Sequence, residues 1–345
     1  MRGSSPPRGN HVPRPPRARL TTPEPLLFLG LRPSESQLSK ARIAVIPAPF
    51  DQTTSYLPGT RFGPKAILEA SRQVEFYDEE LDLEPFQIGV ATLAEIEVEP
   101  ADMEAGLRKL EAVVTEVSAK GMIPLTLGGE HSLTFAPVGA LRERYPGMAV
   151  LQLDAHLDLR DEYQGTKLSH ASVMRRVREL GVPTVAVGIR SVSREEADYV
   201  HAEGAPVFLA REIRARGLDI SAILAALPNP VYITVDLDAF DPAEVPAVGT
   251  PEPGGLTWDE GLRLLRAVCE RRQVVGCDIV ELCPIPGQPA SDFFAAKLAN
   301  KLIGYLGLGP EKESGGERPD AAGARPGRRA APPARRRKPP KRRKG

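Results

Sequence analysis

Two short stretches, LDAHLD at residues 153–158 and TVDLDAFDP at residues 234–242, decide how this sequence folds and what it binds. Each stretch follows an apolar run and places polar side chains at every second position. Side chains two residues apart in an extended chain point to the same face, so each stretch presents its polar groups together. The groups that share a face are Asp154, His156 and Asp158 in the first stretch, and Asp236 and Asp238 in the second.

A third stretch, LTLGGEHS at residues 125–132, adds His131 after a Gly-Gly pair that also follows an apolar run. Together the three stretches supply two imidazoles and four carboxylates. Six such ligands exceed the four of a tetrahedral zinc site and suit two divalent ions with shared carboxylates, and an oxygen-rich set favours manganese. A pair of divalent ions makes hydroxide at neutral pH. The pattern therefore predicts a centre of two Mn²⁺ per subunit that activates water.

Strand-like and helix-like segments alternate along the chain. The apolar runs are mostly continuous, which is typical of strands covered on both faces in a parallel sheet. These runs lie at 41–50, 121–129, 148–156, 182–190, 205–210, 229–237 and 273–282. Helical patterns occupy 63–74, 103–120, 132–144, 169–180, 193–203, 211–226, 257–271 and 290–306. The alternation predicts a three-layer α/β/α domain, with the candidate ligands at the carboxyl edge of the sheet, where open α/β sheets bind ligands.

In this order and at these separations, the motifs GGEHS, LDAHLD, VDLDAFDP, GTPEPGG and VELCP resemble the ureohydrolase family of arginases and agmatinases. The resemblance runs from about Ile43 to about Leu306. It implies a mainly parallel sheet of about eight strands and subunits that assemble into a homo-trimer or hexamer. For the metals it implies one ion on His131 and Asp158, a second ion on His156 and Asp238, and bridging by Asp154 and Asp236.

The resemblance also concerns three side chains with catalytic roles. Glu281, at the end of the run VVGCDIVEL, matches the family's substrate-orienting glutamate, and a carboxylate can pair with a guanidinium through two parallel hydrogen bonds. Asp158 is, as a hypothesis, the group that passes a proton to the departing amine. His170, in KLSHAS, matches a histidine assigned to proton shuttling, and the alternative is a helix-start histidine that only packs or caps.

The loop after LDAHLD distinguishes the guanidine substrates. It reads LRDEYQGTKLSH, with Asp161 and Glu162 side by side, and an acidic rim repels the carboxylate of arginine and attracts an amine. These two residues are therefore predicted to bind substrate. The expected substrate is agmatine, hydrolysed to urea and putrescine as in polyamine biosynthesis. Arg160 and Lys167 oppose this interpretation, because either could serve a carboxylate.

Other substrates and other classes of protein stay open. Within the family the alternatives are N1-aminopropylagmatine, guanidinobutyrate, arginine and formiminoglutamate. A related deacetylase would use one zinc and an acyl-lysine, although such sites have fewer ligands. A non-catalytic binding protein on the same fold is the third class, and the presence of all six ligands and Glu281 argues against it.

The net charge of zero hides an uneven distribution. Residues 1–20 hold five Arg and no acid, and residues 311–345 hold thirteen Lys or Arg against four acids. Of 45 basic and 45 acidic residues, this leaves 27 and 41 between 21 and 310, a net of −14, which attracts a small cationic substrate. Both ends are rich in Pro, Gly, Arg and Ala. We therefore expect a disordered Pro/Arg-rich tail at 1–35, a catalytic domain at 36–308 and a disordered basic tail at 309–345.

Composition also limits the partners and the location. No window of 18 uninterrupted apolar residues could cross a membrane. The three cysteines form no C-x-x-C pair, and an odd count without a signal peptide predicts a cytoplasmic protein. No aromatic residue interrupts the basic runs of the C-terminal tail, so we expect weak binding to polyanions and no nucleic-acid partner.

Overall fold

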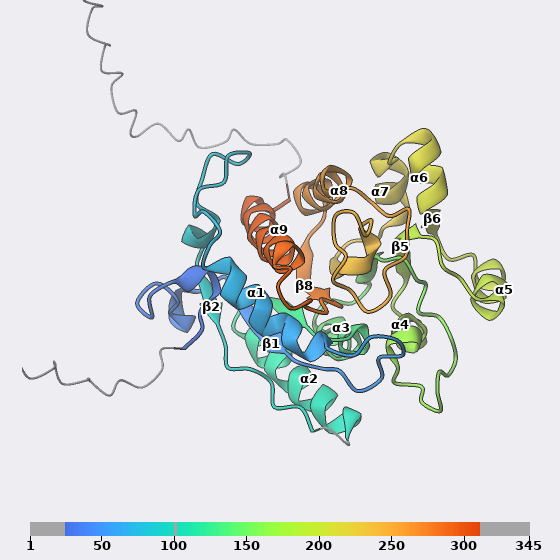
Figure 1. Cartoon of the computed structure of the whole chain (residues 1–345), viewed down its shortest axis with the longest axis horizontal. Coiled ribbons are helices and arrows are strands. Elements are labelled where there is room, and N and C mark those ends of the chain that lie inside the picture. The colour runs from blue at the N-terminus through green and yellow to red at the C-terminus, as the bar shows by residue number, and fades with distance from the viewer. Residues whose placement is uncertain (1–24, 100–101, 311–345) are drawn as a thin grey trace, which may run out of the picture. The chain divides into compact units, whose positions relative to one another are not determined.

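Strands and helices alternate in the computed structural model, which describes residues 25–99 and 102–310 (Figure 1). The strands are β1 Ile43–Ala48, β2 Val90–Thr92, β3 Ile123–Gly128, β4 Ala149–Leu153, β5 Thr184–Ile189, β6 Val207–Leu209, β7 Val231–Asp236 and β8 Val274–Val280. The α-helices are α1 Gly63–Ser71, α2 Met103–Ala119, α3 Phe135–Arg144, α4 Val173–Glu179, α5 Arg194–Glu203, α6 Ala210–Arg216, α7 Ile220–Ala226, α8 Trp258–Arg271 and α9 Ala290–Leu308. Short 3-10 helices are η1 Phe28–Gly30, η2 Leu38–Lys40, η3 Thr60–Phe62, η4 Pro85–Ile88, η5 His131–Thr134, η6 His170–Ser172 and η7 Leu237–Ala239.

The eight strands form one sheet in the order β2-β1-β3-β8-β7-β4-β5-β6, and every pairing is parallel. Every residue of β1, β7 and β8 is buried, which explains why their sequences are continuous apolar runs. The predicted three-layer α/β/α fold with a mainly parallel, about eight-stranded sheet is confirmed.

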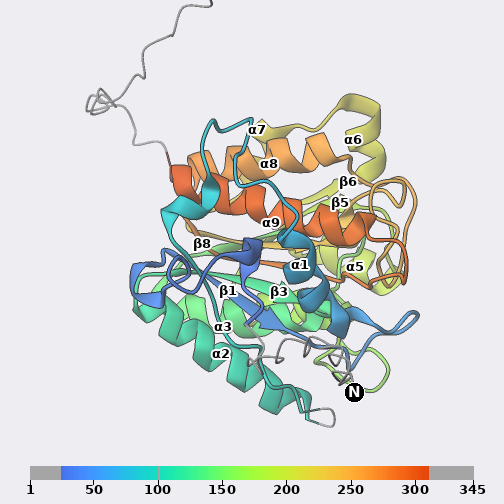
Figure 2. The ribbon, with the colours of Figure 1, turned by 60° about the vertical axis from the view of Figure 1, so that its left-hand side comes forward.

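Helices cover both faces of this sheet and form two separate cores (Figure 2). The first core lies between the sheet and α1, α6, α7, α8 and α9, and the second lies between the sheet and α2, α3, α4 and α5. Helix α8 begins as the sequence predicts, with a capping box. The Thr257 hydroxyl accepts from the Glu260 N–H, and the Glu260 carboxylate accepts from the Thr257 N–H.

Strand order brings the polar motifs together. The strands β3, β8, β7 and β4 are neighbours at the centre of the sheet, although they come from distant parts of the sequence. The pairing places Thr234 of β7 opposite Asp278 of β8, and Leu153 of β4 opposite Val235 of β7. Because all four strands run in the same direction, their carboxyl ends lie side by side at one edge.

A glycine lets the chain pack closely at the end of β3. A Cβ atom on Gly129 would lie 1.8 Å from the carbonyl oxygen of Phe50, so no other residue fits there. The close approach is held by a hydrogen bond of 2.8 Å from the Glu130 N–H to the same Phe50 carbonyl. The loop that follows β1 therefore lies directly beside the GGEHS motif.

Two elements differ from the sequence prediction. The single helix expected over 211–226 is divided into α6 and α7, because Gly217 adopts a φ of 86° and Asp219 caps the second helix through the Ala222 N–H. Strand β2 was not predicted. It is a three-residue edge strand, too short to give a recognisable apolar run.

The folded domain begins before residue 36, so the predicted N-terminal boundary needs correction. Phe28, Leu29 and Leu31 are buried in the first core, and the Leu29 N–H donates to Ser71 Oγ at 2.8 Å. The Pro- and Arg-rich composition upstream concealed this short apolar segment. The remainder of the predicted tails, 1–24 and 311–345, lies outside the described residues. No helix in the described part of the chain is long and apolar enough to cross a membrane.

Phe28→Ala tests the earlier start of the domain. Removing this fully buried ring should lower the free energy of unfolding by about 3–5 kcal/mol, through lost burial and a cavity. Urea denaturation followed by circular dichroism measures the change. The matched control is Phe62→Ala, whose side chain is 62% exposed and whose loss should cost at most about 0.5 kcal/mol. Equal free energies of unfolding for the two variants would contradict the conclusion that Phe28 belongs to the folded domain.

Candidate metal centre and substrate pocket

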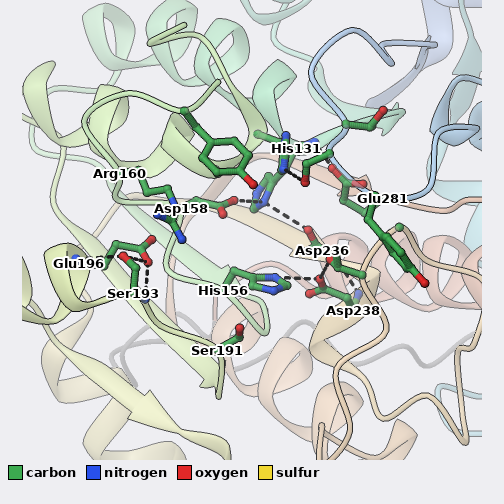
Figure 3. A pocket seen from close by; sticks show the side chains of 18 of the residues that line it. His131, His156, Asp158, Arg160, Ser191, Ser193, Glu196, Asp236, Asp238 and Glu281 are labelled. Carbon is green, nitrogen blue, oxygen red and sulfur yellow. Dashed lines mark hydrogen bonds and ion pairs between the residues drawn. The ribbon is translucent and has the colours of Figure 1, made fainter. Parts of the chain in front are cut away.

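The predicted ligands converge at the carboxyl ends of the four central strands. Figure 3 shows the side chains of His131, His156, Asp158, Asp236, Asp238 and Glu281 around one cavity of about 280 Å³. Two groups have metal-binding geometry, each with its ligand atoms within 4.8 Å of one another: His131, Asp154 and Asp236, and Asp154, His156 and Asp238. Asp154 belongs to both groups, as a carboxylate shared by two adjacent ions must.

Three of the predicted carboxylate ligands direct one oxygen at a backbone N–H and the other at an imidazole. Asp154 Oδ1 accepts from the His156 N–H at 2.6 Å, and Asp236 Oδ1 accepts from the Asp238 N–H at 2.8 Å. Asp238 Oδ1 accepts from the Ala155 N–H at 3.0 Å, which joins the two motifs. The Oδ2 atoms of all three face an imidazole nitrogen. Backbone donors thus hold one oxygen of each carboxylate and turn the other toward an imidazole, and Asp154 Oδ2 also accepts from Gln152 Nε2 at 2.8 Å.

His131 directs one ring nitrogen at the carboxylates. Its Nδ1 lies 2.9 Å from Asp158 Oδ2, 3.1 Å from Asp154 Oδ2 and 3.4 Å from Asp236 Oδ2, and it has no hydrogen-bond partner of good geometry. Burial opposes a charge on this ring, but the three carboxylates outweigh burial and hold the pKa of His131 well above its usual value. A position that attracts a proton this strongly also attracts a metal cation.

The other nitrogen of His131 has a fixed partner. Nε2 lies 2.9 Å from Thr234 Oγ1, and that hydroxyl donates its hydrogen to Asp278 Oδ1 at 2.6 Å. The Thr234 oxygen can therefore only accept from Nε2–H, which leaves Nδ1 free to bind a metal. Asp278 is completely buried and also accepts from the hydroxyls of Thr134 at 2.8 Å and Tyr232 at 2.7 Å.

His156 completes the second group from the more open side. Its side chain is 27% exposed, and its Nδ1 lies 3.0 Å from Asp238 Oδ2 and 3.6 Å from Asp154 Oδ1. Burial opposes protonation, but the charges of Asp238 and Asp154 outweigh it and raise the pKa of His156 to about 12. On the opposite side of the ring, Nε2 lies 3.8 Å from Glu252 Oε1.

The carboxylates themselves are in an environment that disfavours negative charge. Burial, with the charge of Asp154 adding to it, raises the pKa of Asp158 to about 7. Burial and the charges of Asp238 and Asp154 raise the pKa of Asp236 well above its usual range. Such a cluster is stabilised by bound cations, and its set of carboxylate oxygens and imidazole nitrogens fits two divalent ions.

Two residues of the site have a strained backbone. Asp158 has a φ of 53° and Glu281 a φ of 65°, in the left-handed region that side chains with a Cβ rarely adopt. Glu281 is further fixed because its Oε1 accepts from the His131 N–H at 2.6 Å. Strain of this kind persists only where the surrounding structure enforces it, and it is concentrated at functional sites.

Arg190 holds the outer wall of the centre in place. Its guanidinium donates to the carbonyls of Asp238 at 2.6 Å and Glu252 at 2.7 Å, and also to those of Gly188, Ala239 and Phe240. The GTPEPGG loop is thereby fastened to the loop that carries Asp238. Thr250 of the same loop contacts Asp238 Oδ2 at 3.3 Å.

His170 lines the same pocket as His131 and His156. Its Nδ1 lies 3.3 Å from Thr53 Oγ1, and its Nε2 lies 3.3 Å from Ser55 Oγ. Burial lowers the pKa of His170 to about 4, so the ring is neutral at physiological pH. In this neutral form one ring nitrogen is unprotonated and can accept a hydrogen bond.

The structure does not bring Asp161 and Glu162 into the wall of the pocket, which corrects the substrate-binding prediction. Asp161 pairs with Arg176 at 2.8 Å and with Lys167 at 3.3 Å, which neutralise it, and Glu162 is exposed. Lys167 is therefore also engaged away from the cavity. Alternation along a loop does not fix side-chain direction as it does in a strand, so neighbouring acids in the sequence were a poor guide here.

Glu196 is the acidic side chain that lines the pocket instead. It is buried, and its carboxylate accepts from the N–H of Leu159 at 3.0 Å and from the N–H of Ser193 at 2.8 Å. Arg160 lines the same wall, with its guanidinium 5.1 Å from the centre of the Tyr163 ring. The sequence did contain one signal for Glu196, since Ser193 and Glu196 have the spacing of a capping box and form one in α5.

Comparison with known proteins agrees with this geometry. The family model described as "Arginase family" matches residues 41–304. The N(1)-aminopropylagmatine ureohydrolase of Synechocystis sp. is 43% identical over 286 residues, which cover 79% of this chain and 92% of that protein. The agmatinase of Pyrococcus horikoshii is 36% identical over 272 residues, which cover 77% of this chain and 93% of that protein.

A solved structure gives the same result at the level of the fold. The crystal structure of the agmatine ureohydrolase of Thermoplasma volcanium matches with a TM-score of 0.73 and 35% identity, over 79% of this chain and 92% of that one. Both the family model and these relatives span the strands that carry the metal-binding groups. The chain therefore belongs to the arginase family and is a ureohydrolase, an enzyme that hydrolyses linear amidines.

Proposed function

We propose that this enzyme hydrolyses agmatine-type guanidines to urea and a primary amine, with N1-aminopropylagmatine as its preferred substrate and agmatine as the second candidate. The observation that carries the proposal is a cavity with Glu281 beside the metal-binding groups and Glu196 in the outer wall. These two carboxylates suit a substrate with a guanidinium at one end and an amine further along. The acidic body of the protein, with a net charge of −14 between 21 and 310, favours the approach of such a cation.

The relatives support the order of the two substrates. The relative named N(1)-aminopropylagmatine ureohydrolase is 43% identical, whereas the one named agmatinase is 36% identical. A longer substrate chain could also contact Tyr56, Leu57 and Val192, which line the pocket and are 70%, 43% and 41% exposed. The sequence alone ranked agmatine first, on the strength of Asp161 and Glu162, and that argument no longer applies.

We further propose that the six predicted ligands hold two Mn²⁺ ions. His131 and Asp158 would bind one ion, His156 and Asp238 the other, and Asp154 and Asp236 would bridge them. When bound, the two ions would supply hydroxide at neutral pH next to the substrate. The predicted homo-trimer or hexamer and the predicted cytoplasmic location stay predictions.

The protein's own groups orient the substrate and move protons. The carboxylate of Glu281, fixed by the His131 N–H, would pair with the guanidinium and turn its central carbon toward the metal centre. Asp158, which lines the cavity beside His131, would pass a proton from the attacking water to the departing amine. His170 would carry the proton between the pocket and solvent.

A panel of guanidines tests the proposed substrate. Urea release by the manganese-loaded enzyme should have the highest kcat/KM with N1-aminopropylagmatine, followed by agmatine. Arginine and guanidinobutyrate should be poorer because each carries a carboxylate into an acidic cavity. A higher kcat/KM for arginine or guanidinobutyrate than for both amines would contradict the proposal.

Glu196→Gln tests the acceptor for the distal amine. Loss of the charge should raise KM for agmatine about 10- to 100-fold, the equivalent of one hydrogen bond between charged groups. KM for butylguanidine, which has no distal amine, should change little, whereas general damage to the pocket would affect both substrates. Glu162→Gln is the matched control, since this exposed residue lies outside the pocket and its replacement should change neither value.

Asp278→Asn tests whether the buried carboxylate prepares His131 for metal binding. Without an acceptor of full charge, Thr234 is less firmly held, so manganese affinity should fall about 10- to 100-fold. Elemental analysis and calorimetric titration measure this, with two manganese ions per chain expected in the parent enzyme. Tyr232→Phe removes another hydroxyl from Asp278 without touching Thr234, and should have a smaller effect. One zinc per chain in the parent protein would contradict the binuclear centre.

A further inference from the structure

Glu130 is a buried carboxylate beside His131 that has no place in the mechanism above. It is completely buried, and it lies outside the lining of the cavity. Its Oε2 accepts from the backbone N–H groups of Gln52 at 2.7 Å and Thr53 at 2.6 Å. Its Oε1 accepts from the hydroxyls of Ser132 and Thr53, the latter at 2.9 Å. With four donors around it, this carboxylate has a fully satisfied environment and binds no ligand of its own.

Thr53 connects this carboxylate to His170. A threonine hydroxyl has one hydrogen, and Thr53 gives it to Glu130. The hydroxyl oxygen can then only accept, and it does accept the backbone N–H of His170 at 3.1 Å. Nδ1 of the same histidine lies 3.3 Å from this oxygen, so the contact is a hydrogen bond only if Nδ1 carries the proton.

The direction of these bonds determines what the other ring nitrogen can do. In a neutral imidazole, a protonated Nδ1 leaves Nε2 as a lone pair. Nε2 lies 3.3 Å from Ser55 Oγ, and His170 and Ser55 both line the cavity. The remaining polar group near Nδ1 is Ser169 Oγ, which accepts the N–H of Ala171 at the start of η6. Its own hydrogen could compete for Nδ1 only over a longer contact of 3.4 Å, compared with 3.3 Å to Thr53 Oγ1.

We infer that Glu130 is a positioning residue that acts through Thr53 to hold His170 as the Nδ1–H tautomer, with Nε2 facing the pocket as a proton acceptor. Three of the four bonds, those from Gln52 and Thr53, also fasten the loop after β1, whose residues Thr54, Ser55, Tyr56 and Leu57 form one wall of the cavity. Only the catalytic consequence rests on the proposed function, since the tautomer is a property of the protein by itself.

Glu130→Gln reverses the chain of donors. A carboxamide that uses its oxygen for the two backbone N–H groups presents its NH₂ to Thr53, which must then accept and can turn its own hydrogen toward Nδ1. Long-range ¹H–¹⁵N correlation spectra of full-length protein labelled in histidine, loaded with diamagnetic Zn²⁺, distinguish protonated from unprotonated ring nitrogens. His170→Asn identifies the relevant signals among the five histidines.

The parent protein should show a protonated Nδ1 and an unprotonated Nε2 for His170. Glu130→Gln and Thr53→Val should both shift protonation toward Nε2, whereas Thr53→Ser, which keeps the hydroxyl, should restore the parent pattern. Ser132→Ala is the matched control, because it removes a hydrogen bond from Glu130 without touching His170 and should leave the tautomer unchanged. Should Glu130→Gln fail to fold, the comparison of Thr53→Val with Thr53→Ser tests the tautomer of His170.

A protonated Nε2 in the parent protein would overturn the inference, as would an unchanged tautomer in both Glu130→Gln and Thr53→Val. The spectra require no turnover, so an enzyme that proves inactive on agmatine-type guanidines would defeat the proposed function and leave this result standing. Conversely, a wrong tautomer in an active ureohydrolase would defeat the role of Glu130 alone.

Discussion

The convergence of buried carboxylates at one edge of the sheet is the constraint on which the rest of the site depends. Isolated negative charges are costly to bury, and several together repel one another. Here several are partly compensated by a backbone N–H, as when Asp238 accepts from Ala155 or Asp236 accepts from Asp238. Burial, together with the neighbouring negative charges, raises the pKa values of Asp158 and Asp236, and the same negative charges attract cations. The same buried carboxylates therefore require hydrogen-bond donors from the backbone and attract metal cations.

Fixed hydrogen-bond directions extend outward from this centre. Asp278 receives the Thr234 hydrogen, so the threonine oxygen accepts from His131 Nε2 and leaves Nδ1 for a metal. Glu130 receives the Thr53 hydrogen, and the threonine oxygen then accepts from His170. In both cases a buried carboxylate and a hydroxyl determine which nitrogen of an imidazole is free. Neither Asp278 nor Glu130 is a predicted metal ligand, yet each orients an imidazole that lines the cavity.

Loops form the wall of the pocket, and interactions at the ends of helices decide which acidic side chains face the cavity. Glu196 faces the cavity because it also caps α5 with Ser193, and the backbone at Leu159 donates to its other oxygen. Asp161, by contrast, is drawn away by Arg176, which is almost buried on α4. In this chain, ion pairing therefore leaves Glu196 and not Asp161 in the wall of the pocket.

The sequence by itself determined the fold class and the metal-binding motifs, because strand periodicity places every second side chain on one face and apolar runs identify buried strands. It could not show that β3, β8, β7 and β4 are neighbours, since pairing between distant segments depends on packing across the whole sheet. Asp278 and Glu130 were visible only as acids within or beside apolar runs, and their partners lie as far as 144 residues away. Tertiary structure also decided the substrate wall and the buried anchor at Phe28, because ion pairing in loops and burial of a short segment follow from contacts that no local pattern encodes.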